Sequence, residues 1–362
     1  MHNITASPGR YIQGKGAIGE LASYAKKLGK KFFVLVSASG KERVQGLIQA
    51  GMGDSGCSAV YEIFNGECSK KEIKRIEEAF RAAGCDLIIG IGGGKIHDAA
   101  KAAAFYAKAP VIIVPTIAST DAPCSALSVI YSDEGVFEEY MFFPSSPNMV
   151  IVDTDIIAAA PARLLVAGMG DALATYFEAR ACSSSGAGNC VGGKASLTAG
   201  ALAELCYETL LRDGFNAKIA VENGVCTKAV ENIIEANTYL SGIGFESAGL
   251  AAAHAVHNGL TAIEETHAFY HGEKVAFGTL VQLVLENADE FEEALAFCRE
   301  VGLPTTLADL GVTKIDPAKL KKAAALACAA GETTGNMSFK VTAEMVYNAI
   351  IAVDALGRAA AE

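Results

Sequence analysis

The chain has 362 residues, a hydrophobic fraction of 51% and a formal net charge of −11, which is enough length for two domains with substantial apolar cores. The charge is spread along the chain without a basic cluster, so nucleic acid is excluded as an expected partner. No run of 18 or more uncharged apolar residues appears, which excludes a predicted membrane span.

The first sixteen residues contain no apolar segment of the kind found in a secretory signal peptide. Ten cysteines are scattered between Cys57 and Cys328, without a C-x-x-C pair. This spacing supports neither a disulfide framework nor a zinc site made of cysteines. We therefore expect a cytoplasmic protein whose thiols are reduced and mostly buried.

Residues 1–160 are predicted to form an α/β dinucleotide-binding domain. Amphipathic helical patterns, such as that of residues 70–84, separate several short runs that are apolar almost throughout. This alternation indicates a mostly parallel, Rossmann-like sheet that is buried on both faces. The runs predict strands at 31–37, 58–64, 86–92, 110–116 and 148–154. Two alternating runs within 124–143, on either side of residues 132–135, predict an inserted β-hairpin.

Four glycines lie where the strand at 86–92 passes into the helix that follows it: Gly90, Gly92, Gly93 and Gly94. Glycines at a helix N-terminus let the backbone approach a phosphate, and the helix offers free N–H donors. The spacing matches neither the Walker loop nor G-x-G-x-x-G, so a plain tight turn is the alternative. Lys95, directly after the turn, favours a phosphate-bearing ligand. Asp98 is expected to be structural, because a carboxylate suits the first turns of a helix.

Short polar side chains follow the strand at 110–116. Ligands bind at the carboxyl ends of strands in open α/β sheets, although a polar loop with helix caps is the alternative. Four such residues within ten positions, one crossover after the glycine turn, favour a wall for cofactor and substrate: Thr116, Ser119, Asp121 and Ser125.

Residues 161–362 are predicted to form a second, all-helical domain. Pro161 opens a series of segments with helical periodicity, and the breaks between them carry Gly, Pro or Asn. The segments are approximately 170–183, 195–213, 223–243, 247–264, 272–288, 291–302 and 342–360. We expect the active-site cleft where this domain meets residues 1–160.

Four of the six histidines lie within eighteen positions. His254 and His257 are three apart on a predicted helix, so both can point to one side, and His271 precedes the next helix. A catalytic zinc takes three protein ligands and leaves one position open. Asp171, which we expect at a helix start, is the predicted third ligand, and an N-terminal cap is its alternative role. His257 and His267 are expected to have supporting or surface roles.

Five long segments of this sequence resemble the bacterial glycerol dehydrogenases. They are GGGKIHDAAK, PTIASTDAPCSALSVIY, GMGDALATYFEARACSSSG, IEANTYLSGIGFESAGLAAAHAVHNGLTAI and YHGEKVAFGTLVQLVLEN. These enzymes belong to the metal-dependent, iron-type alcohol dehydrogenase superfamily, which includes dehydroquinate synthase and glycerol-1-phosphate dehydrogenase. The resemblance covers essentially the whole chain. It implies a dehydroquinate synthase-like architecture of two domains and a homo-oligomer, often an octamer.

The resemblance also implies NAD-dependent oxidation of glycerol to dihydroxyacetone, with one zinc ion per subunit. The implied zinc ligands are Asp171, His254 and His271, and Asp121 would hydrogen-bond a substrate hydroxyl. The implied cofactor contacts are the turn residues Gly92, Gly93, Gly94 and Lys95, the last two at the pyrophosphate, with Thr116, Ser119, Ser125, Leu127 and Tyr131 along the cofactor.

Two details distinguish this chain from relatives in the superfamily. Iron-type alcohol dehydrogenases place a fourth ligand, a histidine, four residues after the aspartate, where this chain has Thr175. Dehydroquinate synthase uses a glutamate ligand and several basic residues, whereas Lys274 is the only Lys or Arg here between positions 245 and 278. A neutral polyol suits this composition better than a phosphate ester. The remaining alternatives are a dehydrogenase of another 1,2-diol or of glycerol-1-phosphate, a dehydroquinate synthase-type lyase, and a metal- and nucleotide-binding protein without turnover.

One position departs from the family pattern. Glycerol dehydrogenases usually carry an aspartate that binds the adenosine ribose at the end of the first strand, and here Ser37 stands at that place. We predict that NAD remains the preferred cofactor but that NADP is excluded less strongly.

Overall fold

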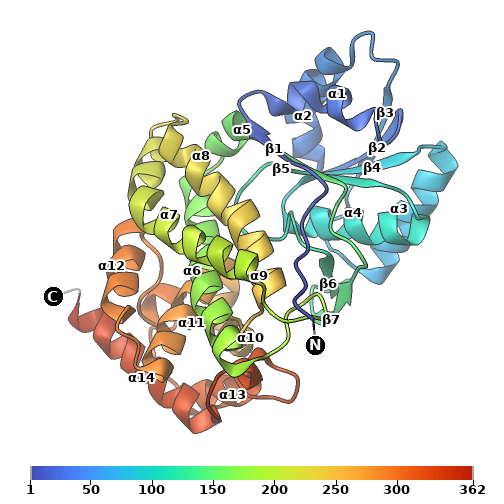
Figure 1. Cartoon of the computed structure of the whole chain (residues 1–362). Coiled ribbons are helices and arrows are strands. Elements are labelled where there is room, and N and C mark those ends of the chain that lie inside the picture. The colour runs from blue at the N-terminus through green and yellow to red at the C-terminus, as the bar shows by residue number, and fades with distance from the viewer. Residues whose placement is uncertain (1, 361–362) are drawn as a thin grey trace.

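The structure is a computed structural model that describes residues 2–360. Its N-terminal part is built on a six-stranded sheet in which every pair of neighbouring strands is parallel (Figure 1). The order is β1-β8-β5-β4-β2-β3, made of β1 (Tyr11–Gly14), β2 (Lys31–Val36), β3 (Ser58–Ile63), β4 (Leu87–Gly92), β5 (Val111–Pro115) and β8 (Met149–Asp153). All five predicted strands are confirmed, and the short strand β1 was not predicted.

Helices cover both faces of this sheet, as its apolar strands require. On one face, Phe32 and Val34 of β2 pack in a cluster with Val44 of α2. On the other face, Phe33 of β2 packs in a cluster with Phe80 of α3. The helices are α1 (Leu21–Ala25), α2 (Ala38–Met52), α3 (Lys70–Ala83) and α4 (Gly94–Ala107), with a 3₁₀ turn, η1 (Ala17–Glu20), before α1.

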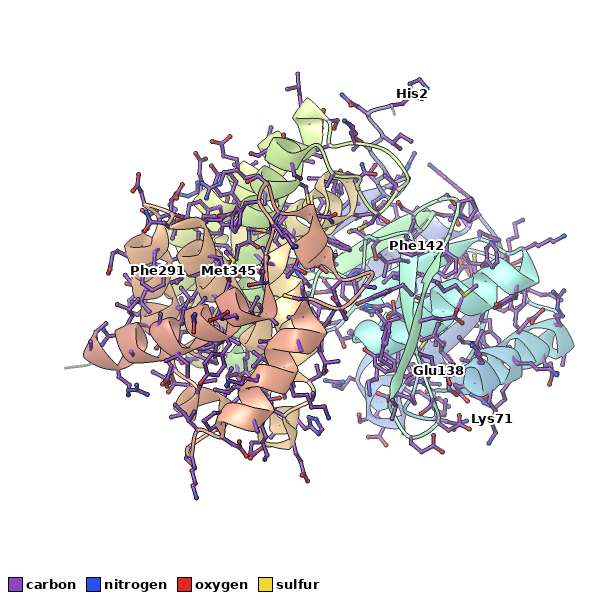
Figure 2. All side chains as sticks on the ribbon, turned by 90° about the horizontal axis from the view of Figure 1, so that it is seen from below. His2, Lys71, Glu138, Phe142, Phe291 and Met345 are labelled. Atoms are coloured by element: carbon purple, nitrogen blue, oxygen red, sulfur yellow. The ribbon has the colours of Figure 1, made fainter. Side chains whose placement is uncertain are left out.

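The predicted hairpin is confirmed as antiparallel strands β6 (Leu127–Tyr131) and β7 (Phe137–Phe142). In Figure 2 the strand β7 runs between the labelled residues Phe142 and Glu138, and Glu138 Oε2 lies 3.2 Å from Lys70 Nζ of α3. Asp98 of α4 holds the hairpin, because its carboxylate accepts a hydrogen bond from the backbone of Val129 at 3.1 Å. This contact agrees with the structural role expected of Asp98.

From residue 154 onward the chain forms no further strand up to residue 360. Its helices are α5 (Thr154–Ala158), α6 (Ala162–Ser185), α7 (Leu197–Glu222), α8 (Lys228–Glu235), α9 (Ser241–Ala248), α10 (Ala252–Leu260), α11 (His271–Glu286), α12 (Phe291–Val301), α13 (Pro317–Ala327) and α14 (Ala343–Ala359). Short turns lie between them: a π-helix, η2 (Ala236–Leu240), and the 3₁₀ turns η3 (Glu264–Ala268), η4 (Ala308–Leu310) and η5 (Thr333–Asn336). Among the described residues, none of the helices combines the length and the apolar character needed to cross a membrane.

The segment predicted as one helix at 223–243 is divided into α8, the π-helix η2 and the start of α9. Helix α13 was not predicted. The helices that matter for the site, α6, α10 and α11, approach one another closely through glycine. A Cβ on Gly272 would lie 1.8 Å from the carbonyl oxygen of Ala167, and one on Gly278 would lie 2.3 Å from that of Ala253. These two glycines therefore allow backbone contact between α6, α11 and α10.

Candidate active site

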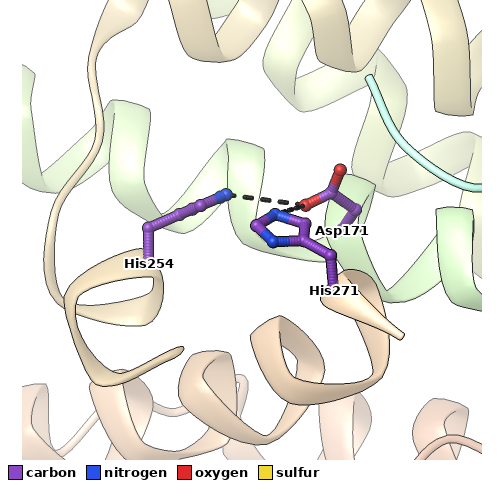
Figure 3. Close-up of side chains that lie close together, drawn as sticks. All are labelled: Asp171, His254 and His271. Atoms are coloured by element: carbon purple, nitrogen blue, oxygen red, sulfur yellow. Dashed lines mark ion pairs between the residues drawn. The ribbon is translucent and has the colours of Figure 1, made fainter. Parts of the chain in front are cut away.

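Asp171, His254 and His271 converge from three different helices, and we call them the Asp-His-His group. Asp171 lies within α6, His254 in the first turn of α10, and His271 is the first residue of α11. His271 Nε2 is 3.0 Å and His254 Nε2 is 3.5 Å from Asp171 Oδ1 (Figure 3). One ligand atom of each residue lies within 4.8 Å of the other two, so a single ion can contact all three.

Asp171 does not start a helix, contrary to the prediction. Helix α6 begins at Ala162 and places Asp171 in its interior, so the capping alternative is wrong. The predicted helix began too late because Gly168 and Gly170 looked like a break. Both glycines are helical, and their missing side chains make room for the backbone of Ala118 and of Gly272.

Each histidine of the group is oriented through its other ring nitrogen. His254 Nδ1 lies 2.6 Å from Glu178 Oε2, and His271 Nδ1 lies 3.0 Å from His257 Nε2. Such second contacts fix the ring and direct the remaining nitrogen toward a metal. Sequence reasoning missed Glu178. Its signal is the spacing of seven from Asp171, which places both carboxylates on one side of α6.

The charges in the group suit a divalent cation. Burial raises the pKa of Asp171, but His271 and His254 outweigh this effect and hold the pKa well below its usual range. Burial likewise lowers the pKa of His254, but Glu178 and Asp171 raise it well above the ordinary value. Asp171 Oδ1 is buried and faces only the Nε2 atoms of His254 and His271 among the described polar groups, as expected of three ligand atoms that share one ion. Two imidazoles and one carboxylate form a donor set that zinc accepts, so the residues fit such an ion.

The Asp-His-His group is most accessible at His271. The side chain of Asp171 is 1% exposed, that of His254 12% and that of His271 39%. His257 is buried, and burial together with the charge of His271 holds its pKa well below the ordinary value, so it is neutral beside His271. His267 is exposed and contacts only a backbone carbonyl, that of Thr261, at 2.8 Å.

The second part of the candidate site, which we call the α/β wall, consists of the carboxyl ends of strands β2, β4 and β5. The strand order reverses between β2 and β4, and ligands bind at such a switch point in open α/β sheets. Ser37 follows β2 and caps α2 by accepting a hydrogen bond from Gly40 N at 3.1 Å. Ser37 therefore follows the second strand of the chain and not the first, because β1 was missed. The glycine turn joins the end of β4, which contains Gly90 and Gly92, to α4, whose N-cap is Gly93. This N-cap has no side-chain hydrogen bond, which leaves the N–H groups of Gly94 and Lys95 free for a ligand.

Lys95 lies at the start of α4 beside two other residues of this wall. Its Nζ is 2.6 Å from Glu67 Oε2 and 5.8 Å from the ring centre of Tyr131. Lys95 and Tyr131, both predicted to contact the cofactor, therefore lie together. Glu67 was not predicted. Its carboxylate forms an ion pair with the ammonium group of Lys95.

The loop between β5 and β6, residues 116–126, reaches the Asp-His-His group. The backbone N–H of Asp121 donates to Asp171 Oδ2 at 3.2 Å, and Asp121 is buried. Burial and the charge of Asp171 raise the pKa of Asp121 well above its usual range. Ser125 behaves differently, because its hydroxyl faces the interior and contacts Lys101 Nζ at 3.3 Å. The other predicted wall residues lie nearby in sequence, Thr116 buried after β5, Ser119 half-buried in the loop and Leu127 half-buried at the start of β6.

A parallel sheet with a glycine turn at its switch point, together with a buried Asp-His-His group that could hold a metal ion, is typical of an enzyme of the nucleotide-using α/β class. The family model for iron-containing alcohol dehydrogenases matches residues 8–154. A glycerol dehydrogenase of Escherichia coli is 55% identical over 360 residues, which are 99% of this chain and 98% of the relative. A probable glycerol dehydrogenase from Sinorhizobium meliloti has a similar solved structure, with a TM-score of 0.93, 47% identity and 99% of both chains covered. The chain therefore belongs to the glycerol dehydrogenase branch of the iron-containing alcohol dehydrogenase family.

Proposed function

We propose that this protein oxidises glycerol, and related vicinal diols, reversibly at the carbon that becomes the ketone, with NAD as the hydride acceptor. The observation that carries the proposal is the Asp-His-His group beside Asp121, on a loop that also lies against the glycine turn at the switch point, where a Cβ on Gly94 would be 3.7 Å from Thr120 Oγ1. The full-length similarity to glycerol dehydrogenases supports the substrate class. The same similarity supports a cytoplasmic homo-oligomer, an octamer by family resemblance, as a further part of the proposal.

Asp171, His254 and His271 are proposed to hold one zinc ion per subunit. Glu178 and His257 keep the two imidazoles turned toward that position. When bound, the metal supplies Lewis-acid polarisation that lowers the pKa of the substrate hydroxyl, and the nicotinamide supplies the acceptor for hydride. The exposed side of His271 is the side from which a substrate reaches the group.

Asp121 is proposed to accept a hydrogen bond from a second hydroxyl of the substrate. Its backbone contact with Asp171 fixes its distance from the metal ligands. On the cofactor side, Gly94 and Lys95 are proposed to bind the pyrophosphate, which requires Lys95 to exchange Glu67 for a phosphate oxygen. The remaining proposed cofactor contacts are Ser37, Gly92, Gly93, Thr116, Ser119, Ser125, Leu127 and Tyr131.

The test is net NADH formation by the purified protein with glycerol, 1,2-propanediol and 2,3-butanediol. We expect turnover with at least glycerol, its loss after treatment with a chelator, and its recovery when zinc is added back. Binding of NAD without NADH formation would contradict the proposal and would favour a non-catalytic binding protein or a lyase. Recovery with another divalent ion in place of zinc would contradict only the identity of the metal.

A further inference from the structure

Asp121 is held by a chain of two buried hydroxyl groups. Ser241 Oγ donates to Asp121 Oδ2 at 2.9 Å, and Thr175 Oγ1 lies 2.8 Å from Ser241 Oγ. Asp121 must be ionised to accept a hydrogen bond from a substrate hydroxyl, and in that state the single hydrogen of the Ser241 hydroxyl is used by the carboxylate. Thr175 must therefore donate to Ser241, and the chain runs in one direction, from Thr175 through Ser241 to Asp121.

Small residues on α9 make this chain possible. A Cβ on Gly244 would lie 2.5 Å from the methyl carbon of Thr175, so α9 approaches α6 at van der Waals distance. A Cβ on Gly242 would lie 3.0 Å from the carbonyl oxygen of Asp121, so the loop is equally close on the other side. Helix α9 is thus inserted between α6 and the loop 116–126, with Ser241 between Thr175 and Asp121.

The backbone of the loop is anchored independently of this hydroxyl chain. Asn237, in the π-helix η2, donates to the carbonyl of Ala118 at 2.9 Å. Glu246 of α9 accepts from the N–H of Ala126 at 2.5 Å. With both flanks of the loop fixed, the hydroxyl chain acts mainly on the orientation of the Asp121 carboxylate.

Only one oxygen of the Asp121 carboxylate accepts a hydrogen bond within this chain of hydroxyl groups. Its hydrogen bond from another side chain goes to Oδ2, and no other described residue donates to Oδ1. We propose that Thr175 and Ser241 are positioning residues that turn Oδ1 toward the substrate, where it accepts a hydrogen bond from the hydroxyl next to the one being oxidised. The inference rests on the proposed function. It assigns the preference for vicinal diols over simple alcohols to this hydroxyl chain, because a simple alcohol leaves Oδ1 without that donor.

The test compares two substrates oxidised at the same kind of carbon, 1,2-propanediol and 2-propanol, which differ by one hydroxyl. In Ser241→Ala we expect the ratio of kcat/KM for the diol to that for the alcohol to fall about tenfold, in the range of one hydrogen bond to a charged group. The matched control is Ser247→Ala, on the same helix. Ser247 is equally buried, but its hydroxyl contacts only the backbone of Ala6. This control should keep the wild-type ratio, and both variants should keep the wild-type content of metal.

A second pair of variants tests the first member of the chain. Thr175→Val keeps the shape of the side chain and removes the donor to Ser241, so the ratio should fall by a factor of about three. Thr175→Ser keeps the donor and should retain a ratio near that of the wild type. An active wild type whose diol preference is unchanged in Ser241→Ala, or falls equally in Ser247→Ala, would overturn the inference and leave the proposed function standing. A wild type that forms no NADH with any polyol would overturn both.

Discussion

The two parts of the candidate site, the helical wall and the α/β wall, are built by different means. The helical wall uses three charged or ionisable side chains from α6, α10 and α11, each held by close helix packing and by a second residue. The α/β wall uses backbone groups and short side chains at strand ends, where the sheet topology alone brings them together. Single substitutions should therefore have large effects in the helical wall and graded effects in the α/β wall.

The largest effect is expected when a member of the Asp-His-His group is removed. His254→Ala should lose the bound metal and lower kcat/KM for glycerol by at least about a thousandfold, since a site with two protein ligands holds zinc weakly. The chain should stay folded, because the alanine leaves its helix intact. Metal content, circular dichroism and turnover of the purified variant check this outcome.

His267→Ala, which removes an exposed histidine, should keep both metal and activity. A His254→Ala enzyme that retains zinc and near-normal turnover would remove His254 from the proposed ligands.

The second largest effect tests the packing that supports the helical wall. Gly272→Ala would place a Cβ 1.8 Å from the Ala167 carbonyl oxygen and must push α11, with His271, away from α6. We expect a loss of about 3 kcal/mol in the free energy of unfolding and weaker metal binding.

Gly200→Ala is the control, because no atom outside its own stretch of α7 lies within 4 Å of the added Cβ. This variant should gain roughly 0.5–1 kcal/mol. Equal stability of the two variants in denaturant titrations would contradict the packing argument.

The two walls also differ in how far the sequence predicted them. The α/β wall was predicted from position, because apolar runs ending in Gly92 and in Thr116 identify strand ends. The Asp-His-His group was predicted from composition and family resemblance, since distance along the chain does not report which helices touch. Glu178 and Ser241 were missed for that reason, as each acts on a residue that only tertiary packing brings near. The π-helix η2 was also missed, because its residues carry ordinary helical periodicity.

Glu246 connects α9 to the end of the loop 116–126, and the third prediction concerns its ionisation. Burial raises the pKa of Glu246 to about 7, from an ordinary value of 4.5, despite the Ala126 hydrogen bond and the charge of Lys101. A carboxyl group with a raised pKa binds its proton more tightly in the folded state. Its contribution to stability is therefore present below pH 4.5 and is lost as the pH rises through about 7.

Glu246→Gln removes this titration and keeps an oxygen that can accept from Ala126. The variant should gain stability relative to the wild type as the pH rises over that window, by up to roughly 3 kcal/mol. Unfolding in denaturant, measured on both proteins at a series of pH values, reports the difference. A difference that does not change with pH would show that Glu246 has no raised pKa in the folded state.

The smallest effect is expected at Ser37, in the α/β wall. An aspartate there can accept hydrogen bonds from both ribose hydroxyls, and its charge opposes the 2′-phosphate of NADP, whereas serine lacks that charge. Arg43 lies close, with one guanidinium nitrogen 4.0 Å from the position of a Cβ on Gly40, while Lys41 stands over the ring of Tyr61. Ser37→Asp should raise the preference for NAD over NADP, measured as the ratio of kcat/KM, by about tenfold. Aspartate is as good an N-cap as serine, so the free energy of unfolding should not change.

Ser196→Asp makes the same change at the N-cap of α7, far along the chain from the α/β wall, and should leave the ratio unaltered. If Ser37→Asp also leaves the ratio unaltered, Ser37 does not face the ribose, and cofactor preference must be set elsewhere along the ends of β2 and β4.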